Sequence, residues 1–492
     1  MRGGEISGEI VMNGKITQFA RRSYRLIFLA ALLVSFLFST VGCSMRDQKP
    51  DDKAKDGILD IRDRSFEEDG MLPLDGEWKF KWEGDGASEP IEGWMQVPGM
   101  WGQKPLKDGT ELPSQGRGIY SLTILHSPTD KLLAIRLPNL STAYNLYVNG
   151  QLQFSRGIVG DDREGTTPYQ LPAIAYFSGQ NGKTELTLEV ANYHHRNGGI
   201  RTELILGTMS QIQSLRFKLQ SQELILFGAL AIIGIYHLGL FALRRRESTN
   251  LFLALLCFGV ACRMASIGEG MFAQWIPSLT WTFALRIEYA AFALSTLFGF
   301  TYYQKMYPDE ISAKWLRLSA GAGILLAALC VALPPLVFSR YVAAYQIYVI
   351  FMSLVCLIGL GRALFHRREG AKLAMVGAVG LVLTVINDIF FYNGWMKSLD
   401  LVSWGLLLLI LMNSFAISLK FSLTYSRAEQ MKTELTEWNH HLEERIAKRT
   451  EELQKSYLAL EESKIGLERM EQSRRQLISN ISHDLRTPIT LL

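Results

Sequence analysis

The sequence lacks the features that mark several common classes of soluble protein. It contains neither the nucleotide-binding loop of P-loop enzymes nor the glycine-rich loop of protein kinases. Its formal net charge is only +4 over 492 residues, which gives little support to nucleic-acid binding. Four of its five cysteines lie inside apolar runs, so neither a disulfide framework nor a cysteine metal site is expected.

Apolar residues are abundant instead, at 48% of the chain with a mean hydropathy of +0.10. This composition predicts a membrane protein of several domains. Arg21, Arg22 and Arg25 precede an apolar run over 26–38, which is the build of a secretory signal. The residues around Cys43 resemble a bacterial lipobox, which implies lipidation of Cys43; an uncleaved membrane anchor is the alternative. We therefore expect a signal or anchor segment over 1–43 and an exported polar tether over 44–56.

The segment 57–210 has the pattern of an exported all-β domain. Short runs alternate apolar with polar residues and are separated by glycine, proline and asparagine. Asn149-Gly150 is a strong signal for a tight hairpin turn. The runs are 76–82, 118–124, 131–137, 143–148 and 183–190. About 150 residues of this kind predict an antiparallel β-sandwich.

The motifs at 74–78, 97–101, 144–150 and 190–193 resemble the galactose-binding-like jelly roll of glycoside hydrolases and bacterial sensor ectodomains. The resemblance leaves a carbohydrate open as the extracellular ligand. The large aromatics Trp78, Trp82, Trp94 and Trp101 could stack on sugars, but we expect them to fill the core. His194-His195 is interpreted as a polar loop rather than a metal site, and no carboxylate pair suggests a glycosidase.

Seven apolar runs of spanning length occupy 223–420 and predict a seven-helix transmembrane bundle. The runs are 223–243, 250–267, 281–303, 316–337, 341–361, 372–392 and 399–420. Basic residues gather in the connections after the first, third and fifth runs, whereas the other connections offer only Arg340 and Lys397. By the positive-inside rule, the β domain is expected outside the plasma membrane and the C-terminal tail in the cytoplasm.

Few ionisable residues occur within the spans, and they fall at similar depth. Arg263, Arg286, Glu288 and Asp388 would all lie in the outer part of the bilayer. Because charges in hydrocarbon are costly, such residues usually face a bundle interior or a polar cavity. They predict either a polar cluster that couples the ectodomain to the helices or a fixed structural pair such as Arg263 with Asp388.

The order of an exported β domain, seven spans and a cytoplasmic helix resembles the bacterial seven-transmembrane receptors with diverse intracellular signalling modules. A transporter is the alternative for the membrane block alone. The odd number of spans and the absence of an evident inverted repeat disfavour it.

Apolar residues in 421–476 continue at spacings of three, four and seven. They form a heptad register, for example at Leu442, Ile446, Leu453 and Leu460, with polar residues such as Asn439 interrupting the seam. This pattern predicts a parallel coiled coil and hence a homodimer.

The segment 477–492 contains Asn480-Ile-Ser-His-Asp-Leu-Arg-Thr-Pro488, which resembles the phosphoacceptor box of sensor histidine kinases. His483 and Thr487 share a helix face because they are four residues apart. The imidazole of His483 could attack the γ-phosphorus of ATP, and Asp484 could orient the ring and accept its proton. The resemblance assigns Thr487 to positioning water for dephosphorylation of a response regulator, and Pro488 could kink the helix.

The resemblance implies an ATP-dependent and Mg²⁺-dependent histidine kinase that passes phosphate to a response regulator. Neither the second phosphotransfer helix nor a nucleotide-binding domain follows, so we expect a sensor portion truncated within the dimerisation and phosphoacceptor domain. A natural, non-catalytic membrane receptor is the alternative. The expected partners are a second copy of the chain, a response regulator, the lipid bilayer and an extracellular ligand, but no nucleic acid.

Overall fold

The computed structural model describes residues 52–84, 90–392 and 401–489. The expected signal segment, with Cys43, lies outside these ranges. The chain divides into two parts, one ending at Ala416 and the other starting at Ile417, and each is described by itself.

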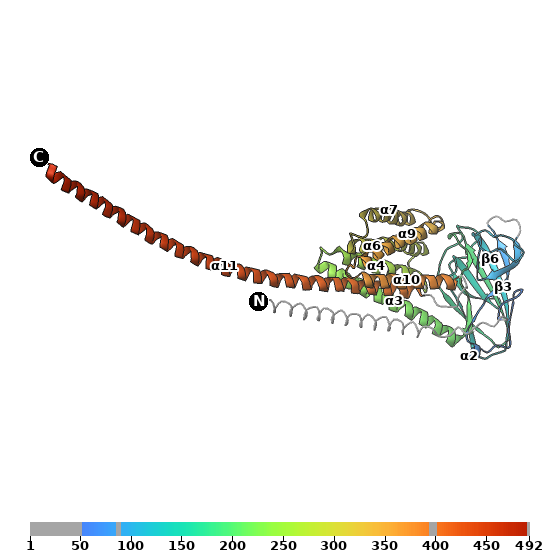
Figure 1. Ribbon diagram of the computed structural model, residues 1–492. Coiled ribbons are helices and arrows are strands. Elements are labelled where there is room, and N and C mark those ends of the chain that lie inside the picture. Colours follow the sequence, from blue (N-terminus) through green and yellow to red (C-terminus); the bar gives the residue numbers. More distant parts are fainter. Residues whose placement is uncertain (1–51, 85–89, 393–400, 490–492) are drawn as a thin grey trace. The chain divides into compact units, whose positions relative to one another are not determined.

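The N-terminal domain is a β-sandwich, in which Figure 1 labels β3, β6 and α2. The larger, seven-stranded sheet has the order β4-β3-β6-β11-β8-β9, with β1 paired in parallel to β6. A four-stranded sheet has the order β10-β7-β13-β2, and β5 pairs with β12. The strands are β1 (Ile58–Ile61), β2 (Leu72–Pro73), β3 (Gly76–Glu83), β4 (Ile91–Val97), β5 (Gly99–Met100), β6 (Gly116–His126), β7 (Leu132–Leu137), β8 (Ala143–Val148), β9 (Gln151–Arg156), β10 (Ala173–Ser178), β11 (Lys183–Asn192), β12 (Gly199–Ile200) and β13 (Ile205–Thr208); the short helix α2 (Phe66–Asp69) follows β1.

The alternating sequence pattern explains which sheet face is buried. Along β6, every second residue from Gly116 to His126 is buried and the intervening ones are partly exposed. The predicted hairpin is confirmed, because Asn149 and Gly150 join β8 to β9 with φ values of 49° and 78°. Positive φ at both turn residues is the geometry that an Asn-Gly pair favours. Ala54, inside the predicted tether, also bridges to Gly76 and so belongs to the sandwich.

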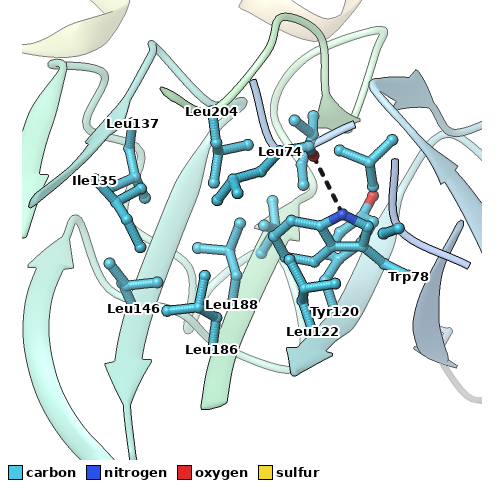
Figure 2. Close-up of a cluster of buried hydrophobic side chains, with 14 of the residues drawn as sticks. Leu74, Trp78, Tyr120, Leu122, Ile135, Leu137, Leu146, Leu186, Leu188 and Leu204 are labelled. Atoms are coloured by element: carbon cyan, nitrogen blue, oxygen red, sulfur yellow. Dashed lines mark hydrogen bonds between the residues drawn. The ribbon is translucent and has the colours of Figure 1, made fainter. Parts of the chain in front are cut away.

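The two sheets enclose one apolar core, shown in Figure 2. Trp78 is fully buried in it and donates a hydrogen bond from Nε1 to the Leu74 carbonyl at 3.3 Å. Trp101 donates to the Tyr120 hydroxyl at 2.7 Å, which satisfies both buried polar groups. Trp82 is also buried, whereas Trp94 lies on the opposite face of the sheet and is partly exposed. Three of the four tryptophans therefore fill the core as predicted.

The membrane block consists of long apolar helices. Its elements are α3 (Met209–Leu243), α4 (Ser248–Ser266), α5 (Met271–Trp275), α6 (Trp281–Met306), α7 (Ala313–Ala332), α8 (Pro335–Arg340), α9 (Val342–Phe365), α10 (Ala371–Tyr392) and α11 (Val402–Ile489). Within the described ranges, six helices are long and apolar enough to cross a membrane, and α10 is a shorter apolar helix over Ala371–Asn387. Six of the seven predicted runs each fall mainly on one of these helices. Pro334 follows the end of α7, so the run predicted over 316–337 divides into α7 and the short α8.

Many apolar side chains of these helices point outward. Ile232 on α3, Val331 on α7 and Ile350 on α9 are each more than 60% exposed. A helix that is apolar on its exposed face as well as its packed face is expected where lipid replaces water. The protein is therefore a multi-pass membrane protein.

The last element, α11, is one uninterrupted helix of 88 residues. It contains the seventh apolar run, the heptad segment and the backbone of the predicted phosphoacceptor box. The described residues give no break in helical structure between the membrane block and His483.

Candidate functional site

The predicted phosphoacceptor residues lie near the end of α11. Asn480 is exposed, and the backbone of His483, Asp484 and Thr487 is helical. A helical backbone places His483 and Thr487 on one face, as the four-residue spacing predicts. The side chains of these three residues lie outside the described part of the structure.

The apolar seam of α11 is uncovered in this single chain. Leu442, Ile446, Leu453 and Leu460 are 57–74% exposed. Exposed leucines at heptad spacing form the surface that a second helix covers in a coiled coil. The charged residues around them form only exposed pairs along the same helix, such as Arg449 with Glu452 at 3.2 Å.

The first membrane helix continues directly from the sandwich. Strand β13 ends at Thr208, and α3 begins at the next residue. Thr208 and Gln211 form a reciprocal capping box, and the Gln211 side chain also donates a hydrogen bond at 2.5 Å to the Phe66 carbonyl. These contacts fix the start of α3 to the sandwich without an intervening linker.

A second connection involves the turn between α4 and α5. Arg136 on β7 forms an ion pair with Glu269, and Asn139 donates a hydrogen bond at 2.6 Å to the Gly268 carbonyl. The Glu269 amide in turn donates to the Glu223 carboxylate of α3 at 3.0 Å. The turn is therefore held by the sandwich on one side and by the first membrane helix on the other.

A third connection centres on Trp281 at the start of α6. Its Nε1 donates to Gln170 Oε1 at 2.8 Å, and the rings of His194 and His195 lie edge-on to the indole at 6.5 Å. The Arg196 amide donates to Ser339 Oγ of α8 at 3.3 Å. Burial lowers the pKa of His195 to about 4, helped by the nearby positive charges of Arg196 and Arg201. The loop predicted as merely polar thus contacts the membrane helix α6 and the short helix α8.

The structure brings only some of the predicted intramembrane charges together. Arg263 and Glu288 interact electrostatically, but the described residues contain no ion pair between them within 4.0 Å. The Arg263 guanidinium lies over the Phe292 ring, 4.6 Å from its centroid. Cys330 Sγ of α7 donates to the Arg286 backbone carbonyl at 3.7 Å. Two residues along a helix separate Arg286 from Glu288 by more than half a turn, so their side chains leave α6 on different sides. Asp388 falls on α10, and its side chain lies outside the described part.

The bundle also contains a buried polar seam that the sequence analysis missed. His237 on α3 contacts Asn250 Oδ1 of α4 at 3.0 Å and Ser414 Oγ of α11 at 2.9 Å. Asn413, the neighbour of Ser414, donates to the Tyr303 hydroxyl of α6 at 2.8 Å. This seam joins three helices to the one that carries the predicted phosphoacceptor. A single histidine or asparagine within an apolar run is the only sequence signal for it.

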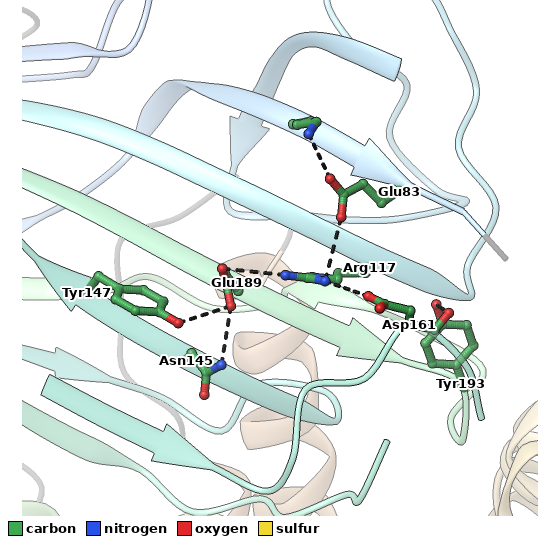
Figure 3. Close-up of polar contacts among 8 residues, drawn as sticks. Glu83, Arg117, Asn145, Tyr147, Asp161, Glu189 and Tyr193 are labelled. Carbon is green, nitrogen blue, oxygen red and sulfur yellow. Dashed lines mark hydrogen bonds and ion pairs between the residues drawn. The ribbon is translucent and has the colours of Figure 1, made fainter. Parts of the chain in front are cut away.

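A further polar cluster lies on the solvent face of the larger sheet (Figure 3). Arg117 on β6 faces Glu189 of β11, Glu83 of β3 and Asp161 of a nearby loop, with the Asp161 contact at 2.5 Å. Asn145 donates to Glu189 at 3.2 Å. Each carboxylate therefore has a partner. The described residues hold no cluster of three or more potential metal ligands.

Comparisons with known proteins assign the membrane block. Residues 221–426 match the family model for the 7TM diverse intracellular signalling domain. This domain is found in signalling receptors, so the chain contains a transmembrane signalling domain. No curated protein matches the chain.

Three similar solved structures are glycoside hydrolases, each covering 28% of this chain with a TM-score of 0.21. They are a GH2 β-galacturonidase from Eisenbergiella tayi (17% identity), a β-glucuronidase from Ruminococcus gnavus (17%) and a putative β-galactosidase from Bacteroides fragilis (16%). The aligned region spans between 22% and 28% of the length of these proteins.

Proposed function

We propose that the chain is the sensor portion of a two-component histidine kinase. The observation that carries this proposal is the phosphoacceptor-like box on the helix that continues from the last membrane helix. In this function, a signal at the ectodomain changes the arrangement of the spans and controls ATP-dependent phosphorylation of His483. Phosphate then passes to an aspartate of a response regulator.

The box residues divide the chemistry between them. The neutral imidazole of His483 is the nucleophile toward the γ-phosphorus, and Asp484 orients the ring and accepts its proton. Thr487, on the same face of α11, positions the water that hydrolyses the phosphoaspartate of the response regulator and releases inorganic phosphate. Asn480 precedes the nucleophile by three residues and completes the box on the same side of the helix.

The uncovered seam of α11 supports a homodimer. Pairing two copies in parallel would bury the exposed leucines and isoleucines and place the two boxes side by side. ATP and Mg²⁺ would be bound by a catalytic domain that these 492 residues do not supply.

The orientation proposed for the membrane block has support from two sources. The sandwich contacts the α4–α5 turn, the start of α6 and the helix α8, which all lie on one side of the bundle. The basic connections lie at the opposite ends of the same helices, for example Arg244, Arg245 and Arg246 after α3. The positive-inside rule therefore supports a sandwich outside the cell and a cytoplasmic α11.

The proposal is tested by incubating the membrane-reconstituted chain with γ-labelled ATP and a histidine-kinase catalytic domain. Acid-labile, base-stable label is expected on the wild-type chain and is lost in His483→Gln. The matched control is His440→Gln, which removes an exposed histidine from the same helix and should leave labelling unchanged. Equal labelling of wild type and His483→Gln would contradict the assignment. Absence of label from both, with a catalytic domain shown to be active on another substrate, would favour a non-catalytic receptor.

A further inference from the structure

A small cavity lies where the sandwich meets the membrane helices. Its volume is about 40 Å³, enough for a few water molecules or one small polar group. Asn139, Tyr169 and Gln170 line it from sandwich loops, and Trp281 and Glu288 line it from α6. The cavity wall therefore combines residues of the ectodomain and of the membrane bundle.

Four donor groups in the cavity wall already have an acceptor. Trp281 Nε1 donates to Gln170 Oε1, and Gln170 Nε2 donates to Ser141 Oγ at 2.8 Å. Asn139 Nδ2 donates to the Gly268 carbonyl, and Ser266 Oγ donates to the Cys262 carbonyl at 2.9 Å. The amide nitrogens of Asn139 and Gln170 each keep a second N–H, so the donors alone do not decide the charge of a ligand.

Acceptors remain free in the same wall. Asn139 Oδ1 is buried and has no hydrogen-bond partner among the described residues. The Glu288 carboxylate has electrostatic interactions with Arg263 and Arg201 but no hydrogen bond or ion pair within the described ranges. An acceptor without a donor is unfavourable in a buried site, so the Glu288 carboxylate favours a ligand that donates hydrogen bonds. Asn139 Oδ1 is too deeply buried to be reached from the cavity.

The charge of the cavity wall determines whether a cationic or a neutral hydrogen-bond donor is favoured. Glu288 is the one acidic or basic residue that lines the cavity. Arg201 is exposed, so water screens its charge, and the Arg263 guanidinium is directed to the Phe292 ring. Trp281 and Phe272 supply aromatic walls, which also favour a cation.

We propose that this cavity binds the primary ammonium group of a small amine, with the Glu288 carboxylate as its acceptor. The remaining N–H donors of the ammonium group can be accepted by the second carboxylate oxygen and the Tyr169 hydroxyl. Occupancy would join the sandwich loop that carries Tyr169 to α6. The use of this site as a sensory input rests on the proposed function, whereas binding itself does not.

The test uses the full chain in lipid nanodiscs, titrated with methylammonium and followed by calorimetry and by the thermal midpoint. Saturable binding is expected for wild type. Glu288→Gln should weaken it at least about tenfold, the equivalent of about 1.4 kcal/mol, while Glu288→Asp should retain measurable binding. Glu247→Gln, which alters an exposed carboxylate outside the cavity, should bind as wild type does.

Three results would overturn the proposal: no saturable binding, equal binding by Glu288→Gln, or binding of acetate or methanol as tight as that of methylammonium. The His483→Gln chain should bind methylammonium normally. Failure of the kinase proposal and failure of the ligand site are therefore seen in separate measurements.

Discussion

Arg136 of the sandwich and Glu269 of the α4–α5 turn form an ion pair in which the side chains are only 13% and 4% exposed. The two residues are 133 positions apart in sequence. They belong to different domains, so the pair is a direct electrostatic link from the ectodomain to the membrane helices.

Removing one member of this pair should destabilise the protein, because the other charge stays buried without compensation. We expect Arg136→Ala or Glu269→Ala to lower the free energy of unfolding by about 3 kcal/mol, as a fall in thermal midpoint of the solubilised chain. Replacing both residues with apolar ones, Arg136→Met with Glu269→Leu, should recover most of the loss. Arg62→Ala is the control, since its pair with Asp60 is exposed and contributes less than about 1 kcal/mol. A loss no larger than that of the control would show that the pair has no structural role.

Acid should weaken the contact of the sandwich with Trp281. Burial lowers the pKa of His195 to about 4 from its ordinary 6.5. Between these values the unfolded chain binds more protons than the folded one, so stability is full above the window and falls as pH falls through it. We expect the decline of the thermal midpoint between pH 6.5 and pH 4 to become shallower in His195→Gln. The exposed control His440→Gln should retain the wild-type slope. An unchanged slope of the thermal midpoint against pH in His195→Gln would show that other titrating groups cause the acid sensitivity.

Asp75 is expected to give the opposite dependence of stability on pH. Burial, with a contribution from Glu203, raises its pKa to about 7, and its Oδ1 has no partner among the described residues. Because the folded protein holds this proton more tightly, stability falls as pH rises through 7. Asp75→Asn should therefore stabilise the chain by about 1–3 kcal/mol at pH 8 and much less at pH 5, measured by thermal unfolding. Asp60→Asn should not stabilise at pH 8, because Arg62 lowers the pKa of Asp60. The same shift for Asp75→Asn at both pH values would rule out titration as the cause.

Gly76 illustrates a position where a side chain does not fit. Its φ is +118°, and an added Cβ would lie 2.3 Å from the Ala54 carbonyl oxygen. We expect Gly76→Ala to displace the segment around Ala54 and destabilise the sandwich by more than about 2 kcal/mol. Gly70→Ala is matched to it, since Gly70 also has a positive φ, +76°, but open space around it. The difference between the stability losses of the two variants measures the effect of the close contact between the added Cβ and Ala54. Equal losses would show that the positive φ alone causes the destabilisation.

Local patterns predicted most of the elements. Alternation along β6, the Asn149-Gly150 turn and the seven apolar runs each depend on neighbouring residues, and the structure confirms them. The connections between domains could not be predicted in this way. Nothing near Glu269 in sequence indicates Arg136, and Trp281 resembles any aromatic residue at the end of a span. Tertiary contacts across more than a hundred residues leave no periodic signal.

The intramembrane charges show the same limit. Depth in the bilayer placed Arg263 and Glu288 at one level, and the structure brings them into electrostatic range. Their side-chain directions depend on helix rotation, which hydropathy does not give. Arg286 lies more than half a turn around α6 from Glu288, although its depth is similar.

Because β13 continues directly into α3, the ectodomain fixes the rotation of the first membrane helix about its own axis. Each residue inserted between Thr208 and Met209 would turn the helix by about 100° relative to the sandwich. A chimera that exchanges ectodomains at this point would have to keep the helical phase as well as the reading frame. Inserting seven residues, close to two full turns, should therefore disturb such a receptor less than inserting five, although it moves the domains further apart.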